Sequence, residues 1–147
     1  MPMNPLESNR HLIERYYYEL WNPWRFDLAD QFLSPSVKFH GSVGVGVEGV
    51  DGFRSYMRLI QSAFPDFHNT IEEMVAEGDR VAARLSYRGT HSGVIFGVEP
   101  TGRTIQYDGL AHFRIGGGKI AEGYVLGNVT HLLGQMGIQI AAQKTAS

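Results

Sequence analysis

Apolar residues at the start of the chain are spaced three and four apart, the pattern of an amphipathic helix. Asn4-Pro5-Leu6-Glu7 combines an N-capping residue, a proline in the first turn and a glutamate at the third position, so it predicts a helix start. Ile13, Tyr16, Tyr17 and Leu20 continue the helical spacing, and the sequence WNP ends it.

Two further helices are expected before residue 66. The segment WRFDLADQFL has Trp24 and Phe32 on one face and closes at Ser34-Pro35. After a short strand, VKFH, and a glycine-rich loop, the clearest apolar stripe runs from Phe53 to Phe64 and stops at Pro65. The first half of the chain is therefore mostly helical.

In the second half the pattern changes to strand-like alternation. TIEEMVAEGD and RVAARLSYRGTH predict two strands joined by a Gly-Asp turn, and RTIQYDGLAHFRI and KIAEGYVLGN predict two more, joined by Gly116–Gly118. Such short turns connect antiparallel strands. The order of elements predicts an α+β fold, in a single domain over 1–147 with a frayed tail from about 140.

Alternation also assigns the faces of this sheet. Ile105, Tyr107 and Phe113 share the core side of the third long strand. The core side of the last strand carries only small residues, which predicts a cavity there; they are Ala121, Gly123, Val125 and Gly127. The other face is too apolar for a sheet in water, and it predicts a homodimer contact through Leu110, Tyr124 and Leu126, beside His112.

Composition narrows the function classes. The chain has 147 residues, a net charge of −2 and no cysteine. A basic field for nucleic acid, disulfides and thiolate chemistry are therefore not expected. The sequence shows no secretory signal and no apolar run long enough for a membrane span, so we expect a cytoplasmic protein.

The stretch GVGVEG, residues 44–49, matches the letters of a dinucleotide-binding loop. That loop requires a parallel βαβ unit and a helix N-terminus free to receive a pyrophosphate. Here Glu48 and Asp51 would repel the phosphate, and the surrounding elements do not alternate. We interpret the stretch as a connection with no nucleotide.

Several strings in order resemble one family. They are AFPDFHNTIEEMVAEGDRVAARLSYRGTHSG, PTGR, HFRIGGGKIAEG and LLGQMG, and the likeness runs from about residue 10 to about 137. They resemble the SnoaL-like polyketide cyclases of the nuclear transport factor two-like superfamily. The resemblance implies a curved antiparallel sheet closed by N-terminal helices into a cone, with intramolecular aldol chemistry that needs no metal or cofactor. Some relatives in this family assist hydroxylation instead.

Three residues are candidates for chemistry. His40 ends the short strand, where the similar steroid isomerases have a carboxylate base, and a histidine can act as a base near neutral pH. Tyr17 lies where those isomerases have a tyrosine that stabilises an oxyanion. His91 faces the core side and must be hydrogen-bonded or face a cavity. The alternatives are a histidine hydrogen-bonded at a strand end and ordinary core packing.

The other predicted site residues form an apolar wall, and the sequence predicts neither a metal site nor a serine nucleophile. We expect Trp21, Met57, Phe64, Phe96 and Tyr107 to line the wall of a pocket for a small apolar ligand. The histidines show no H-x-x-x-H or H-x-H spacing, so no metal site is predicted. No G-x-S-x-G serine nucleophile is present either.

The sequence departs from the family in its last strand, where characterised cyclases have an acid/base aspartate. If that aspartate corresponds to Val125 it is lost; Glu122 and Asp108 are carboxylates nearby, but alternation turns both outward. We expect a cofactor-independent cyclase or isomerase that acts on a carbonyl compound through an enolate, with His40 as base. The alternatives are a non-catalytic ligand-binding domain on the same fold, which the loss of the aspartate favours, and a hydrolase or dehydratase.

Overall fold

A computed structural model describes residues 3–139, so the tail predicted from about 140 lies outside the described residues. The helices are α1 (Pro5–Arg15), α2 (Ala29–Phe32), α3 (Gly49–Ala63) and α4 (Val129–Gln135), with a π turn at Tyr16–Trp21 and a 3-10 turn at Phe26–Leu28. The strands are β1 (Leu33–His40), β2 (Gly46–Glu48), β3 (His68–Glu77), β4 (Arg80–Thr90), β5 (Thr104–Gly116) and β6 (Lys119–Gly127).

The six strands form one sheet in the order β2-β1-β6-β5-β4-β3. The four-strand antiparallel meander β3–β6 is confirmed. β1 adds to it in parallel, with Phe39 opposite Gly123 and His40 opposite Tyr124, and β2 pairs antiparallel with β1. The sheet is therefore mixed, because one parallel pair joins the N-terminal hairpin to the meander.

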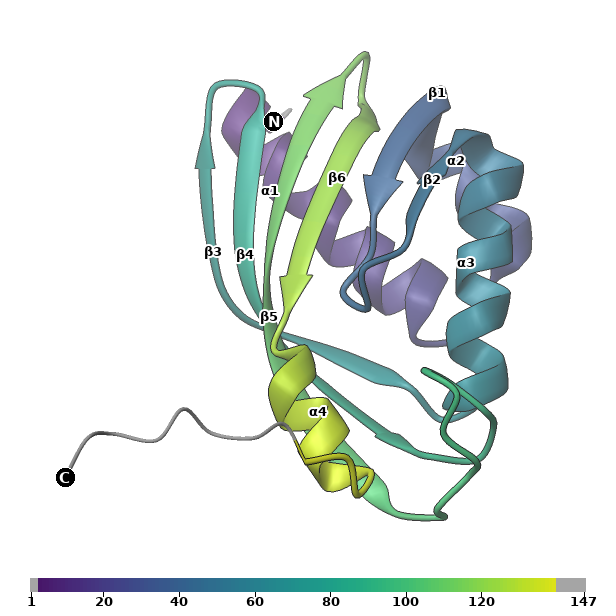
Figure 1. Cartoon of the computed structure of the whole chain (residues 1–147). Helices are drawn as coiled ribbons and strands as arrows, with labels where there is room; N and C mark the ends of the chain where they lie inside the picture. Colours follow the sequence, from purple (N-terminus) through teal and green to yellow (C-terminus); the bar gives the residue numbers. More distant parts are fainter. Residues whose placement is uncertain (1–2, 140–147) are drawn as a thin grey trace, which may run out of the picture.

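The sheet is strongly curved and the N-terminal helices lie on its inner side. Figure 1 shows α1 crossing behind the strands and α3 standing beside β2, while the lower halves of β3 and β4 bend beneath α3. Buried side chains from α1, the π turn and α3 meet those of the strands in one core. The predicted α+β fold, a curved sheet covered by N-terminal helices, is confirmed, although the sheet is not antiparallel throughout, because β1 pairs in parallel with β6.

Local signals explain where the elements begin. The side chain of Asn4 accepts a hydrogen bond from the backbone N–H of Glu7 at 2.9 Å, so the predicted cap of α1 is present. β1 starts at Leu33, before Pro35, although the sequence indicated a break there. The ladder with β6 is irregular between Leu33 and Lys38, which accommodates a proline that has no N–H to donate.

The glycine stretch 44–49 is ordered, not merely a flexible connection. It contains β2, and Gly49 opens α3 with its φ at +74°. The preceding strands form an antiparallel hairpin, and α3 leads to β3 at the opposite edge of the sheet. The parallel βαβ unit of a dinucleotide fold is therefore absent from residues 3–139.

α4 is a further element that the sequence analysis missed. It is a seven-residue helix after β6, capped by the Asn128 side chain, which accepts from the N–H of His131 at 3.3 Å. None of the helices in the described part of the chain is long and apolar enough to cross a bilayer.

Candidate functional site

A small cavity lies on the inner side of the sheet, enclosed mainly by aromatic rings. We call it the inner cavity; its lining is Tyr16, Tyr17, Trp21, Phe39, Ser42, Tyr56, Ile60, Phe67, Asn69, Tyr87 and Val125. Its volume is about 20 Å³, enough for a single water molecule. No carboxylate and no imidazole is among these residues.

The π turn places three of the lining side chains together. Its backbone bonds span five residues, as in Asn22 N–H to Tyr17 O at 3.0 Å and Arg25 N–H to Leu20 O at 2.9 Å. The wider turn brings Tyr16 and Tyr17 to the same face as Trp21. Such turns are rare and are often found at functional sites.

Five buried tyrosines surround or adjoin this space: Tyr16, Tyr17, Tyr56, Tyr87 and Tyr107. The rings of Tyr87 and Tyr107 lie 4.6 Å apart, and those of Tyr16 and Tyr17 4.8 Å apart. Burial raises the pKa of all five phenols, in the case of Tyr56 to about 12. All five therefore stay neutral hydrogen-bond donors near pH 7.

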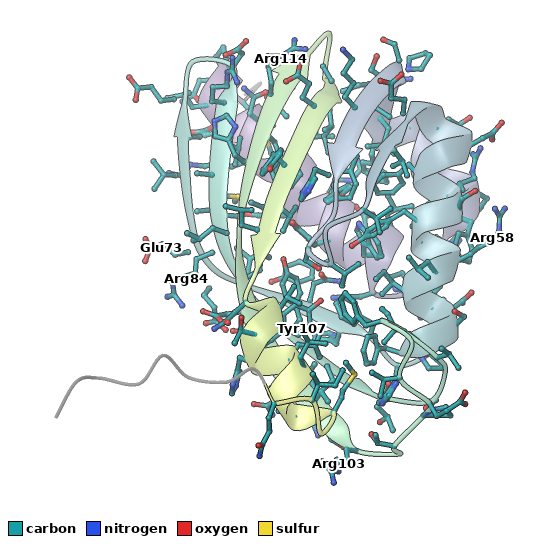
Figure 2. All side chains as sticks on the ribbon, viewed as in Figure 1. Arg58, Glu73, Arg84, Arg103, Tyr107 and Arg114 are labelled. Carbon is teal, nitrogen blue, oxygen red and sulfur yellow. The ribbon has the colours of Figure 1, made fainter. Side chains whose placement is uncertain are left out.

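The loop between β1 and β2 closes one side of the inner cavity. Ser42 Oγ lies 2.9 Å from the Tyr107 hydroxyl, and the loop is braced by a bond from Gly41 N–H to Val45 O at 2.8 Å. Gly41 is required here, because a Cβ at this position would lie 2.0 Å from Cζ of Tyr56. Figure 2 shows Tyr107 on this inner side, whereas Glu73 and Arg84 project from the other.

The space predicted beside the small residues of β6 is filled. A Cβ on Gly123 would lie 2.9 Å from the Phe39 ring, and one on Gly127 would lie 2.5 Å from the carbonyl oxygen of Ser42. β1 and its loop thus occupy the room that these glycines leave. Of the four small residues predicted to line a cavity, Val125 is the one that lines the inner cavity.

His40 lies on the outer side of the sheet, not at the mouth of the inner cavity. It alternates with Phe39, which is buried inward, so its ring points the other way. The ring stacks on Tyr124, with centroids 4.3 Å apart and planes 8° apart. His40 Nδ1 lies 3.2 Å from the carbonyl oxygen of Val125, so Nδ1–H donates and Nε2 is the basic nitrogen.

His40 lines a groove on this outer face, which we call the outer groove. It holds about 420 Å³ and is lined by Lys38, Phe39, His40, Gly46, Val47, Glu48, His112, Glu122, Gly123 and Tyr124. Lys38 stands between Glu48 and Glu122 in the ladder. The outer groove therefore combines both signs of charge with two imidazoles.

His91 is fully buried at the end of β4, away from both sites. Its Nδ1 accepts from the backbone N–H of Thr101 at 3.2 Å and lies 3.0 Å from the Thr101 hydroxyl. These contacts tie together the two ends of the 92–103 loop. Nε2 has no partner among residues 3–139, and the nearest aromatic ring described is Phe64, 5.9 Å away.

The predicted apolar wall is present only in part. Trp21 lines the inner cavity, and Tyr107 adjoins it through Ser42. Met57 and Phe64 are fully buried in the core but do not line the cavity. Phe96 is 40% exposed in the 92–103 loop, with φ at +54°, because this loop turns the residue out of the core.

The carboxylates near the last strand both point outward, as alternation predicted. Glu122 is exposed and bound to Arg114 at 2.9 Å, a contact that lowers the pKa of the Glu122 carboxyl. Asp108 accepts from the side chain of Asn128 at 3.3 Å. No group of three or more potential metal ligands occurs in the described part of the chain.

The sequence analysis missed several cavity residues. Tyr56 lies on the apolar stripe of α3, and Tyr87 on the core side of β4, so the patterns that assigned those faces could have identified both. Asn69 shows no such signal. It is fixed by Asn22, whose side-chain oxygen accepts from the Asn69 backbone N–H at 2.8 Å.

The outer face also carries a cluster of exposed apolar side chains. We call it the outer apolar patch: Val75, Leu110, Tyr124 and Leu126, each more than half exposed. These residues line a hollow of about 320 Å³ over β3–β6. Alternation predicted Leu110, Tyr124 and Leu126 on this face, and the structure places them together with Val75, which was not predicted.

Comparisons with known proteins agree with this architecture. A family model of SnoaL-like polyketide cyclases matches residues 11–136, while no curated protein matches the chain. The structure of a proposed SnoaL-like polyketide cyclase from Jannaschia sp. CCS1 superimposes on this one with a TM-score of 0.83 at 19% sequence identity. The superposition covers 92% of this chain and 96% of that one.

Two solved structures from Streptomyces are more similar in sequence, each 27% identical. IdmH, a proposed polyketide cyclase from S. antibioticus, has a TM-score of 0.76 and covers 88% of this chain and 99% of its own. AclR, a proposed hydroxylase from S. galilaeus, has a TM-score of 0.79 and covers 95% and 87%. With the family match spanning nearly the whole described fold, this chain belongs to the SnoaL-like polyketide cyclase family.

Proposed function

We propose that this protein binds a small apolar carbonyl compound in the inner cavity and promotes its cyclisation or isomerisation through an enolate. The observation that carries the proposal is the group of neutral phenols and one indole N–H around a buried space. Donors of this kind stabilise negative charge that develops on oxygen, and removal of one such donor typically costs about 10²–10³-fold in kcat.

The cavity lining also restricts the substrate. Enolisation moves a proton from carbon to a base, and no carboxylate or imidazole lines the inner cavity. A methylene between two carbonyl groups is acidic enough to need only weak assistance. This favours a polyketide-like β-dicarbonyl compound, and the proposed cyclase activity of IdmH agrees with that class.

The predicted role of His40 as a base is a separate proposal, because His40 does not line the inner cavity. Its free Nε2 faces the outer groove, so it can act as a base only on a substrate bound there. Comparison of His40→Ala with His112→Ala, two variants in the same groove, tests this role. An equal rate for both variants and the unmodified protein would remove His40 from the mechanism.

A second candidate function is ligand binding without chemistry. It is favoured by Val125, which lines the inner cavity with an apolar side chain in the strand where the family has its aspartate. A carboxylate at this position would face the ligand; a valine cannot exchange protons with it.

Ligand entry requires the inner cavity to widen, since it now has room for one water molecule. We propose that the β1–β2 loop moves, and that the Ser42–Tyr107 hydrogen bond, together with the packing of Ser42 on Gly127, holds it against the strands. Replacement of Ser42 by alanine should therefore speed ligand association.

The test uses 2-tetralone, an apolar bicyclic ketone. Its C1 methylene lies between the carbonyl group and the aromatic ring, so it is activated from both sides, as in a β-dicarbonyl compound, and exchanges protons through the enolate. NMR in D₂O follows both binding and loss of the C1 proton signal. Faster exchange with protein, reduced in Tyr17→Phe, supports the enolate function. Binding with no acceleration supports the second candidate, and no binding at millimolar 2-tetralone contradicts both.

We also propose that two copies associate through the outer apolar patch. More than half of each of the four side chains is exposed, a larger apolar surface than isolated surface residues present. Light scattering should give twice the 16.4 kDa mass of the chain; a monomer at micromolar concentration would contradict this association.

A further inference from the structure

The indole N–H of Trp21 is a buried donor without a hydrogen-bond acceptor among residues 3–139. Two buried side-chain nitrogens lack a hydrogen-bond partner in the part of the chain that the structure describes, and only Trp21 Nε1 belongs to the inner cavity. The second tryptophan provides a contrast, because Trp24 Nε1 donates to the carbonyl oxygen of Pro65 at 2.8 Å. An unpaired buried donor is costly, and native proteins rarely keep one without a role.

The acceptor oxygen beside the Trp21 indole is the hydroxyl of Tyr16. The Tyr16 hydroxyl is close enough for the indole to lower the pKa of that phenol, an effect that burial outweighs. Its position does not meet the geometry of a hydrogen bond from Nε1. The ring is held by edge-on contacts with Phe53 and Tyr56, whose centroids are 5.7 Å and 5.8 Å away. The indole is therefore fixed with its donor unused.

The chemistry of the indole defines what can pair with it. A phenol can donate or accept, but an indole N–H can only donate. Its partner must therefore be an acceptor, such as the oxygen of a ketone, an ester or an enolate. An ammonium group is excluded as the partner, and no carboxylate lines the inner cavity to neutralise one.

We infer that Trp21 Nε1–H binds the carbonyl or enolate oxygen of the ligand and selects oxygenated ligands over hydrocarbons of the same shape. This inference rests on the proposed function, since it requires that the inner cavity widens to admit a ligand. It assigns Trp21 a polar role in addition to its place in the apolar wall. The π turn would then serve to hold this donor beside Tyr16 and Tyr17.

The experiment compares two probes with the same bicyclic carbon frame, 2-tetralone and tetralin, which lacks the oxygen. Dissociation constants for both are measured by NMR titration with the full chain. We expect the unmodified protein to prefer the ketone, and Trp21→Phe to lose roughly tenfold of that preference while still binding tetralin. Both probes lose the same apolar contacts when phenylalanine replaces the larger indole. The ratio of their two dissociation constants therefore reports only the contact with the ketone oxygen.

Trp24→Phe is the matched control, because it also replaces one indole but one whose N–H is already bonded. It should leave the preference for 2-tetralone over tetralin unchanged. The indole N–H signal that disappears from its ¹⁵N spectrum belongs to Trp24, so the remaining signal belongs to Trp21. With the unmodified protein, 2-tetralone should move the Trp21 Nε1–H signal downfield and tetralin should not. This measurement needs no Trp21 variant, so it stands even where Trp21→Phe fails to fold.

The outcomes distinguish failure of the proposed function from failure of the role of Trp21. If neither probe binds, the proposed function fails. If both bind equally and the Trp21 signal does not move, the inner cavity binds apolar ligands and the role of Trp21 is refuted. A ketone preference that persists in Trp21→Phe would assign the oxygen to a phenol instead, and it would also overturn the inference.

Discussion

Replacement of Leu110 by aspartate should dissociate the proposed dimer. Leu110 is 62% exposed and lies beside Leu126, which is 60% exposed. Full burial of a leucine contributes about 1.5–3 kcal/mol, so burial of the remaining surface of Leu110 contributes about 1–2 kcal/mol. A two-fold interface contains each residue twice, and Leu110→Asp therefore costs about 2–4 kcal/mol before charge repulsion is counted.

This loss corresponds to a rise of roughly 30- to 1,000-fold in the dimer dissociation constant. Sedimentation velocity over a concentration series measures it directly. Ser55→Asp is the matched control, because Ser55 is an exposed residue of α3, which packs on the inner side of the sheet. An unchanged dissociation constant for Leu110→Asp, with a far-UV spectrum like that of the unmodified protein, would show that copies do not meet at the outer apolar patch.

Four further predictions follow from the core and the inner cavity. The pKa of Tyr56 is raised from 10 to about 12, so the unfolded state loses this proton first. The resulting stability, about 2–3 kcal/mol, is fully present below pH 10 and is lost as the pH rises through 12. The difference in absorbance at 295 nm between the unmodified protein and Tyr56→Phe isolates this phenol from the exposed Tyr18 and Tyr124. That difference should appear together with loss of circular dichroism, and its appearance near pH 10 in a still-folded protein would contradict the assignment. Asn22→Ala leaves the backbone N–H and carbonyl of Asn69 unpaired, so it should lower the free energy of unfolding by about 1–3 kcal/mol. Urea titration measures this loss, and an unchanged midpoint would show that water replaces these bonds. Val125→Asp introduces a carboxyl group into the inner cavity; it should accelerate C1 exchange of 2-tetralone and lower the melting temperature more at pH 8 than at pH 5, because the charged form is the one penalised by burial. Neither NAD nor ATP should raise the melting temperature. A nucleotide at a hundredfold excess over its Kd would add about 2.7 kcal/mol to the free energy of unfolding, so a clear shift would indicate a nucleotide site at residues 44–49.

The sequence predicted the architecture well because its signals are local. The cap at Asn4, the apolar stripe of α3 and the alternation in β4 and β5 each depend on neighbours a few residues apart, and all three are present in the structure. The same alternation predicted that Leu110 and Tyr124 share the outer face. The helical spacing placed Tyr16 and Tyr17 on one face, although spacing alone cannot distinguish a π turn from an α-helix.

The site was predicted less well, for two different reasons. His40 was predicted to be the base from its resemblance to a strand-end carboxylate in other proteins, whereas alternation along VKFH turns it outward, beside Tyr124. That information was present in the sequence. The filling of the space at Gly123 by Phe39 was not, because it depends on the parallel pairing of β1 with β6, two segments far apart in the chain.

This parallel pairing also affects the order of events during synthesis. β1 leaves the ribosome early, but its partner β6 is the last strand to emerge, and it must then insert between β1 and β5. Until then one edge of the β1–β2 hairpin has free N–H and carbonyl groups, a surface on which other chains can pair. Closure over such a long segment slows folding. A nascent chain stalled before Lys119 would therefore be exposed to aggregation, and we expect chaperones to bind the protein mainly at that stage.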